Sequence, residues 1–495
     1  MKRVAFSLAL SLAVAALPAR ADDFRASAPL PTASHRPLAP TIREAKLPNG
    51  VRVLVIERHG GLPVVAVRVV SDVGAFQAGP GVAQLAAESA LRGESDLAHS
   101  FNEIGALRSV HADWDGVQVS VACLAPALDR AIELAWNTAN EASFQATYVK
   151  DARDAALREH EDGHWSAMHG LDEALYPAGD PLRDGISASR AASEAIQPVQ
   201  LEEYFARAFS ADHVTLVVVG DTTLEAVVEG ARTWLGGARP AAKPAAKVAA
   251  SPTPAPKRGL TVIDRPGSTE SSIAMGAVGV PRTSPDRPAI EVLIAALEHR
   301  FDLILRERNG YTYGFHAHAT SDRTRGEIVV DGKVETWHTG QSLREMFTVI
   351  DQLRAAPVDD LELAVAKALR RALDPRFRET NAAAADALGD LVKEGLPLDT
   401  WPRDVVAVDH VTREDVLRVA RTYLDPSHMP IVVVGDAKAI VPTLPDVSDT
   451  AASAAVPAPP TTTTPVAPTV TTKPTKLTAP TPLKTLEPPA MTPKP

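Results

Sequence analysis

The feature that most constrains this fold is an internal duplication. The run Val217-Val218-Val219-Gly220-Asp221 recurs as Val432-Val433-Val434-Gly435-Asp436. Near the start of the same two regions, Val55-Ile56-Glu57-Arg58 corresponds to Val262-Ile263-Asp264-Arg265. The two matches occur in the same order, with offsets of 215 and 207 residues. Because solenoid repeats are far shorter than this, the pattern predicts one domain present in two copies.

Two proline-rich stretches separate these copies from each other and from the C-terminus. Residues 238–258 contain five prolines among Ala and Lys, which is typical of a semi-rigid linker. Residues 441–495 repeat Pro, Thr, Ala and Val and contain no aromatic residue, so we expect an extended, disordered tail. The predicted folded regions are therefore an N-terminal domain over residues 40–237 and a C-terminal domain over residues 259–440.

The N-terminus has the three parts of a secretory signal peptide. Lys2-Arg3 is followed by an apolar run from Val4 to Leu17 and by the cleavage pattern Ala19-Arg20-Ala21. The run is shorter than the ~20 residues that a membrane span needs. We therefore expect residues 1–21 to be removed and residues 22–39 to form an N-terminal extension. The protein would be exported, periplasmic or secreted, with no membrane span in the mature chain.

Charge and cysteine content exclude several functions. The chain carries 51 Lys and Arg against 61 Asp and Glu, a net charge of -10, which argues against a nucleic-acid partner. The single cysteine, Cys123, excludes an intrachain disulfide and a multi-cysteine metal site. It lies in the apolar run from Val117 to Leu124, so we expect a core residue and not a nucleophile.

Hydrophobic patterning predicts an α+β fold. The β-branched runs 51–56 and 64–70 are typical of strands, and residues 81–92, 127–140 and 151–160 have helical periodicity. The predicted architecture is two homologous domains, each an antiparallel-rich sheet with helices packed on one face.

The first domain resembles the pitrilysin/insulinase family of zinc metallopeptidases, in its processing-peptidase-like branch. Leu47-Pro48-Asn49-Gly50 is followed by two strands and then by a helix from Gly81 to Gly93. In that family the helix carries two zinc-binding His and a Glu that activates water. Here the matching positions hold Gln84, Ala87 and Glu88, and Glu159 falls on the position of the third ligand. The resemblance implies a degenerate zinc site, with no cofactor in this chain.

A second zinc pattern follows directly. His160-Glu161-Asp162-Gly163-His164 matches H-E-x-x-H, in which two His on one helix bind zinc and Glu is the base. Asp162 and Gly163 are unfavourable inside a helix, where Gly costs ~1 kcal/mol relative to Ala. Ala167 and Gly170 also break the extended form of the motif. We expect an exposed, charged helix end here, and we keep an independent zincin as an alternative.

The second domain carries a different signal. An amphipathic helix over residues 289–305 leads into Arg306, the turn Asn309-Gly310 and the alternation Tyr311, Tyr313, Phe315, which predicts a strand. This resembles the L-R-x-x-x-x-G-x-x-Y segment of the non-zinc half of the same family. The resemblance implies that Arg306 and Tyr313 hold the substrate backbone and stabilise the developing oxyanion.

These observations favour one function and leave two alternatives. The first is a non-catalytic subunit of an exported zinc metalloendopeptidase. It would pair with a homologous zinc-bearing chain and present Arg306 and Tyr313 to an extended peptide, which adds to a sheet edge. The second is a peptide-binding or chaperone-like scaffold without a catalytic partner. The third is a zincin that uses His160 and His164.

Overall fold

A computed structural model of the chain describes residues 40–92, 95–159, 163–184, 190–241, 255–376 and 379–444. The predicted signal peptide and N-terminal extension, most of the predicted linker and nearly all of the predicted tail lie outside the described residues. Within the described ranges, no helix combines the length and the apolar character that crossing a membrane would need.

The N-terminal half, residues 40–241, is built on a six-stranded sheet, sheet A, with the order β1-β2-β6-β3-β5-β4. Neighbouring strands are antiparallel except β2 and β6, which run parallel. The strands are β1 (Arg43–Lys46), β2 (Arg52–Glu57), β3 (Val64–Ser71), β4 (Leu107–Ala112), β5 (Val117–Leu124) and β6 (Val214–Gly220). The central strands β3 and β6 are almost continuously buried, so both faces of this sheet are covered.

The C-terminal half, residues 255–444, repeats this arrangement in a five-stranded sheet, sheet B, with the order β7-β11-β8-β10-β9. Its one parallel pair, β7 and β11, takes the place of β2 and β6. The strands are β7 (Leu260–Asp264), β8 (Glu270–Val278), β9 (Phe315–Ser321), β10 (Gly326–Glu335) and β11 (Ile431–Gly435). The shared strand order confirms the predicted α+β fold with two homologous units.

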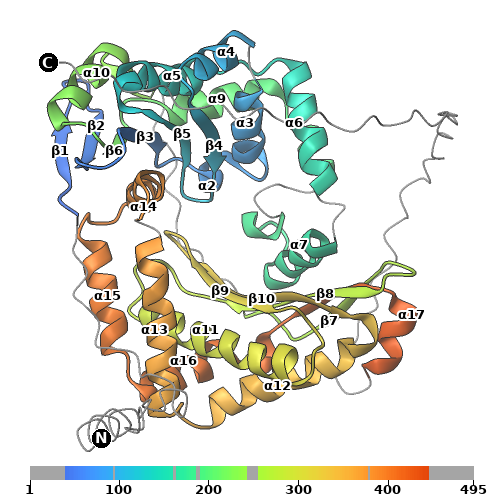
Figure 1. Cartoon of the computed structure of the whole chain (residues 1–495). Coiled ribbons are helices and arrows are strands. Elements are labelled where there is room, and N and C mark those ends of the chain that lie inside the picture. Colours follow the sequence, from blue (N-terminus) through green and yellow to red (C-terminus); the bar gives the residue numbers. More distant parts are fainter. Residues whose placement is uncertain are drawn as a thin grey trace, which may run out of the picture. The chain divides into compact units, whose positions relative to one another are not determined.

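Helices follow the strands in each half (Figure 1). Those of the N-terminal half are α2 (Ala75–Ala78), α3 (Val82–Leu91), α4 (Ser95–Glu103), α5 (Leu128–Asn140), α6 (Ala146–Glu159), α7 (Gly163–Leu175), α8 (Arg190–Ala195), α9 (Pro198–Ala208) and α10 (Leu224–Leu235). Those of the C-terminal half are α11 (Arg287–Phe301), α12 (Thr339–Ala355), α13 (Asp360–Arg376), α14 (Asn381–Lys393), α15 (Thr400–His410), α16 (Arg413–Tyr423) and α17 (Ala437–Ile440). The short 3₁₀ helices are η1 (Ala125–Ala127), η2 (Pro181–Asp184), η4 (Thr336–His338), η5 (Pro426–His428) and η6 (Val441–Thr443). The segment η3 (Asp302–Arg308) is a π-helix.

One helix of each half packs on the sheet of the other half, a feature that the sequence patterns do not predict. Helix α14 of the C-terminal half packs on β3 and β6, where Leu388 and Leu391 join a buried cluster with Leu54 and Val217. Helix α7 of the N-terminal half packs in the same way on β8 and β11 of sheet B. Figure 1 shows both helices beside the sheet of the opposite half. Helices therefore cover two faces of each sheet and not one.

A buried arginine fixes α14 to sheet A. Arg68 of β3 is 4% exposed. Its guanidinium donates to both carboxylate oxygens of Asp386 on α14, at 2.6 and 3.2 Å, and also to the carbonyl oxygens of Val67, Val121 and Ala382. This set of bonds joins residues that are 318 positions apart in the chain.

Candidate functional site

Helix α3 carries the positions that correspond to the zinc motif. Gln84 and Glu88 are half-buried and lie one turn apart on the same face of the helix. The Gln84 amide donates to the Glu88 carboxylate at 2.8 Å. Between them, Ala87 is 1% exposed and belongs to the hydrophobic core.

These side chains do not fit a zinc ion. Zinc sites use imidazole, thiolate or carboxylate ligands, whereas α3 offers an amide, one carboxylate and a methyl group at the three positions. Within the residues that the structure describes, no group of three or more His, Cys, Asp or Glu side chains is placed to hold a metal ion. No zinc chemistry can therefore be assigned to α3.

Helix α3 lies beside an edge strand of sheet A. The helix packs on β4, α6 and α9. Strand β4 is the last strand of sheet A and pairs with β5 on one side. Its residues Leu107, Ser109 and His111 are exposed. An extended chain can hydrogen-bond to the unpaired backbone groups of such a strand.

The third predicted zinc position, Glu159, directly precedes the H-E-x-x-H run, most of which lies outside the described residues. Glu159 is the last residue of α6, the helix that contacts α3, and its side chain is outside the described part of the chain. His160 and Glu161 also lie outside the described residues. Gly163 and His164 are the first residues of α7, the next described helix.

Arg306 and Tyr313 lie on the connection between α11 and β9. Arg306 belongs to η3, its side chain is 57% exposed, and it forms an ion pair with Asp302 at 4.0 Å. Tyr313 is 96% exposed. Tyrosine usually buries part of its ring, so the exposed Tyr313, on the same connection as the exposed Arg306, is available for contact with another molecule.

The predicted strand through Tyr311 and Tyr313 is wrong, because β9 begins at Phe315. Gly310 has a φ of 66°, which turns the chain after η3. The Thr312 hydroxyl then accepts from the Gly314 N–H at 3.0 Å and donates to the Lys333 carbonyl at 2.6 Å. A turn that is held by hydrogen bonds of the Thr312 side chain therefore replaces the predicted strand.

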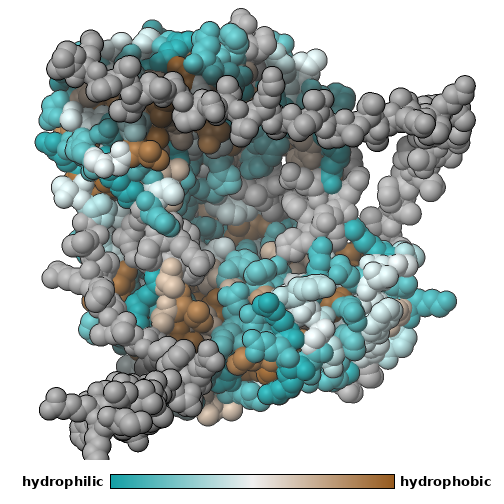
Figure 2. Space-filling model, in the orientation of Figure 1, coloured by the Kyte–Doolittle hydropathy of each residue, from teal (hydrophilic) through white to brown (hydrophobic). Residues whose placement is uncertain are grey.

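Further aromatic side chains flank this connection. The ring of Tyr311 stacks on His338 with centroids 4.1 Å apart. Trp337 is 61% exposed, and its indole N–H donates to Glu335 at 2.9 Å. On the face shown in Figure 2, hydrophobic residues form small separate areas in a mainly hydrophilic surface. Exposed Trp, Tyr and Arg are the residue types enriched at protein interfaces.

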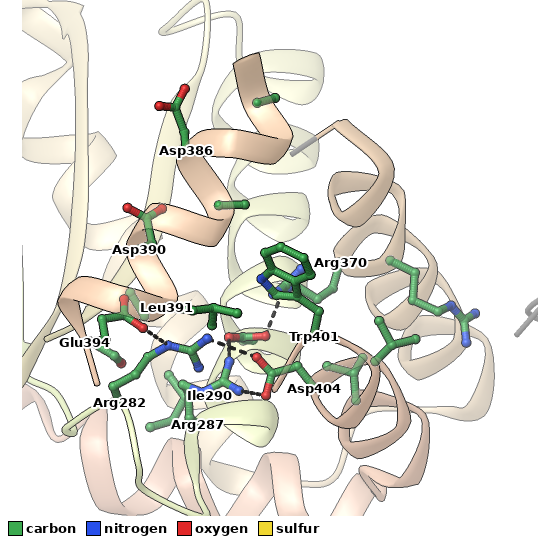
Figure 3. A pocket seen from close by; sticks show the side chains of 18 residues that line it. Arg282, Arg287, Ile290, Arg370, Asp386, Asp390, Leu391, Glu394, Trp401 and Asp404 are labelled. Carbon is green, nitrogen blue, oxygen red and sulfur yellow. Dashed lines mark hydrogen bonds and ion pairs between the residues drawn. The ribbon is translucent and has the colours of Figure 1, made fainter. Parts of the chain in front are cut away.

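A cavity of about 430 Å³ in the C-terminal half is lined by side chains of α11, α13, α14 and α15 (Figure 3). Arg282 donates to Glu394 at 2.9 Å and to Asp404 at 3.1 Å, and Arg287 links Asp404 to Glu291. These groups satisfy one another across the cavity. We assign them to holding α14 and α15 against α11, since their positive and negative charges are already paired.

Cys123 is a core residue, as predicted. It is 7% exposed, and burial raises the pKa of its thiol to about 11. The thiolate needed for nucleophilic attack is therefore scarce near neutral pH.

Comparison with known proteins agrees with this geometry. Residues 195–370 match the family model described as the peptidase M16 inactive domain. The fold resembles the peptidase M16 inactive domain from Pseudomonas fluorescens (23% identity, TM-score 0.71) over 80% of this chain and 98% of that one. It also resembles a protease from Helicobacter pylori (14% identity, TM-score 0.73). A structure described as an M16-like peptidase from Alicyclobacillus acidocaldarius is similar as well (16% identity, TM-score 0.70). Each match covers 80% of this chain and 99% of the other. No curated protein sequence matches this chain.

Proposed function

Because this chain belongs to the M16 peptidase family and lacks its zinc motif, we propose that it is the non-catalytic subunit of an exported zinc metalloendopeptidase. A homologous chain would carry the zinc ion. This chain would supply Arg306 and Tyr313 to an extended peptide bound in the partner's site.

The observation that carries the proposal is the contrast between α3 and the α11–β9 connection. On α3, Ala87 is buried in the core and Gln84 is bonded to Glu88, so this face has no catalytic set. On the connection, Arg306 and Tyr313 are both exposed to solvent. A chain that uses its own zinc site would need catalytic residues on α3. A subunit that completes the site of another chain needs exposed side chains such as Arg306 and Tyr313.

The chemistry of the pair suits a peptide carbonyl. Arg306 offers a planar fork of donors that stays charged, and Tyr313 offers one directed O–H. Donors aimed at an oxyanion are worth ~3 kcal/mol of barrier, or about a hundredfold in rate.

The test is co-expression with a homologous zinc-bearing chain. We expect a stable heteromer whose peptidase kcat/KM falls 10- to 100-fold on Arg306→Ala and on Tyr313→Phe. Arg308→Ala is the matched control, because Arg308 is exposed on the same segment η3. If the chains stay separate, or if Arg306→Ala and Arg308→Ala have equal effects, the proposal is wrong.

A peptide-binding scaffold without a catalytic partner is the second candidate. The free edge of β4 beside α3 favours it, because this edge belongs to the chain itself. Tight peptide binding by the isolated chain, with no effect on any peptidase, would support it. Stoichiometric zinc in the isolated chain that is lost on His160→Ala would instead support the zincin alternative.

A further inference from the structure

Two corresponding hairpin turns meet where the halves of the chain touch. The turn between β4 and β5 is closed by a bond from Asp113 N to Gly116 O at 2.9 Å, and the turn between β9 and β10 by one from Asp322 N to Arg325 O at 2.7 Å. Arg323 connects the two turns. Its backbone N–H donates to the Asp115 carboxylate at 2.8 Å, and its guanidinium donates to the Asp72 carbonyl at 3.2 Å.

The C-terminal end of α14 also contacts the β4–β5 turn. The Lys393 ammonium bonds Asp113 of the β4–β5 turn and, at 2.8 Å, Asp390 of its own helix. The next residue, Glu394, accepts from Arg282 at 2.9 Å, and Arg282 also reaches Asp404. Each of these cations is thus shared between carboxylates.

Asp322, the first residue of the β9–β10 turn, lies close to several of these carboxylates. The groups that act on it most strongly, after burial, are the carboxylates of Asp115, Glu327, Asp113 and Glu394. Burial and this repulsion raise the pKa of Asp322 to about 8. Burial also raises the pKa of Glu394 to about 7 and that of Asp115 to about 6.

A second group of acids lies where α7 packs on β10. The Tyr176 hydroxyl donates to Glu327 at 2.6 Å, and Arg325 pairs with Asp180 at 2.7 Å. Burial, followed by repulsion from Glu327 and Glu173, raises the pKa of Asp172 to about 8. Burial raises the pKa of Glu327 as well, although the Tyr176 hydroxyl and Arg325 oppose that shift.

We call these two groups together the acidic junction. Its four cations are Arg282, Arg323, Arg325 and Lys393. Against them stand seven carboxylates, those of Asp113, Asp115, Asp172, Asp180, Asp322, Glu327 and Glu394. Asp390, Asp404 and Glu173 add negative charge at its rim, and Arg287 offsets Asp404. Like charges at this density cannot all be ionised in a half-buried site.

We propose that the acidic junction is a proton-controlled latch between the two halves of the chain. When Asp322 and Asp172 carry protons, the turns, α7 and α14 pack without uncompensated charge. When these groups ionise, repulsion weakens the contact between the halves. Each group has a folded-state pKa above its unfolded value, so its contribution is complete below about pH 4 and is lost as pH rises through about 8.

The first test compares the thermal unfolding of the full mature chain at pH 6 and pH 9, with and without Asp322→Asn. The amide has the size of the protonated acid and cannot ionise. We expect the midpoint temperature of wild-type unfolding to be lower at pH 9 than at pH 6. The decrease should be smaller in the variant, by on the order of 2 °C, so that the variant is the more stable protein at pH 9. Glu203→Gln, an exposed carboxyl on α9, should follow the wild type. Glu327→Gln provides a second variant in case Asp322→Asn does not fold.

The second test measures the contact directly. Spin labels on Glu229→Cys of α10 and Asp351→Cys of α12 report the distance between the halves, and the buried Cys123 will not take the label. We expect a distance distribution that broadens from pH 6 to pH 9, and that broadens less in Asp322→Asn. The proposal is overturned if the two proteins have parallel pH profiles, or if the distance distribution is the same at both pH values.

Discussion

The contact between Arg68 and Asp386 should govern how firmly α14 is held to sheet A. The change we consider is Arg68→Met, which keeps most of the apolar stem and removes the guanidinium. Arg68 is 4% exposed and makes five hydrogen bonds, two to Asp386 and three to backbone carbonyls. The loss therefore combines a charged pair with acceptors that lose a donor.

The magnitude follows from burial. A hydrogen bond to a charged group contributes ~1.5–3 kcal/mol. Arg68 donates two such bonds to Asp386, and we halve their sum to ~1.5–3 kcal/mol because the Asp386 side chain is 45% exposed and can be hydrated. The carbonyls that lose a donor add ~1 kcal/mol. We expect Arg68→Met to weaken the attachment of α14 by about 3 kcal/mol, which is roughly a hundredfold change in an opening equilibrium.

Hydrogen exchange of the α14 amides measures this opening without requiring two-state unfolding. We expect exchange to accelerate about a hundredfold in Arg68→Met. Arg52→Met is the matched control, since Arg52 on β2 pairs with Glu44 at 2.6 Å but is 35% exposed, and such surface pairs contribute ~0.5 kcal/mol. If α14 exchanges no faster in Arg68→Met than in Arg52→Met, our reading of the contact is incorrect.

Two further changes test the packing of α3 and α14. Ala87→Glu, which restores the family's catalytic carboxylate, should lower the free energy of unfolding by ~2–4 kcal/mol, because position 87 is 1% exposed and has no room for a charged group. Gln84→His, at a half-buried position of the same helix, should change it by less than ~1 kcal/mol, and thermal unfolding separates the two. Leu388→Ala should cost ~3 kcal/mol, since Leu388 is fully buried between α14 and sheet A, whereas Leu369→Ala on α13, where the side chain is 45% exposed, should cost ~1 kcal/mol or less in the same assay.

Much of the fold was predictable because its strongest signals are local. The β-branched runs around Val55 and Val67 become β2 and β3, and the repeated VVVGD runs become β6 and β11. The exchange of α7 and α14 was not predictable. An amphipathic helix indicates which face it buries but not which sheet receives that face, and the partner of Asp386 lies more than 300 residues away.

The candidate site divides in the same way. The absence of a complete zinc ligand set at Gln84, Ala87 and Glu88 follows from residue identity alone. The strand expected through Tyr311 and Tyr313 failed because Thr312 bonds its own turn and Gly310 has a positive φ, and neither feature alters the alternation of polar and aromatic residues. The acidic junction was also missed, since its members come from turns and helix ends that become neighbours when the two halves fold together.

The packing of α3 explains how this helix is held in place without zinc ligands at Gln84, Ala87 and Glu88 acting as a set. In small metal-dependent domains, zinc binding supplies folding free energy, and its loss unfolds the chain. Here Ala83, Ala86 and Ala87 bury α3 in the core of the N-terminal half, and α14 and α7 join the two halves through apolar clusters. The described fold is therefore held together without a set of zinc ligands on α3. Arg306 and Tyr313 on the α11–β9 connection lie in the other half and are exposed, as our proposal of a subunit that completes a partner's site requires.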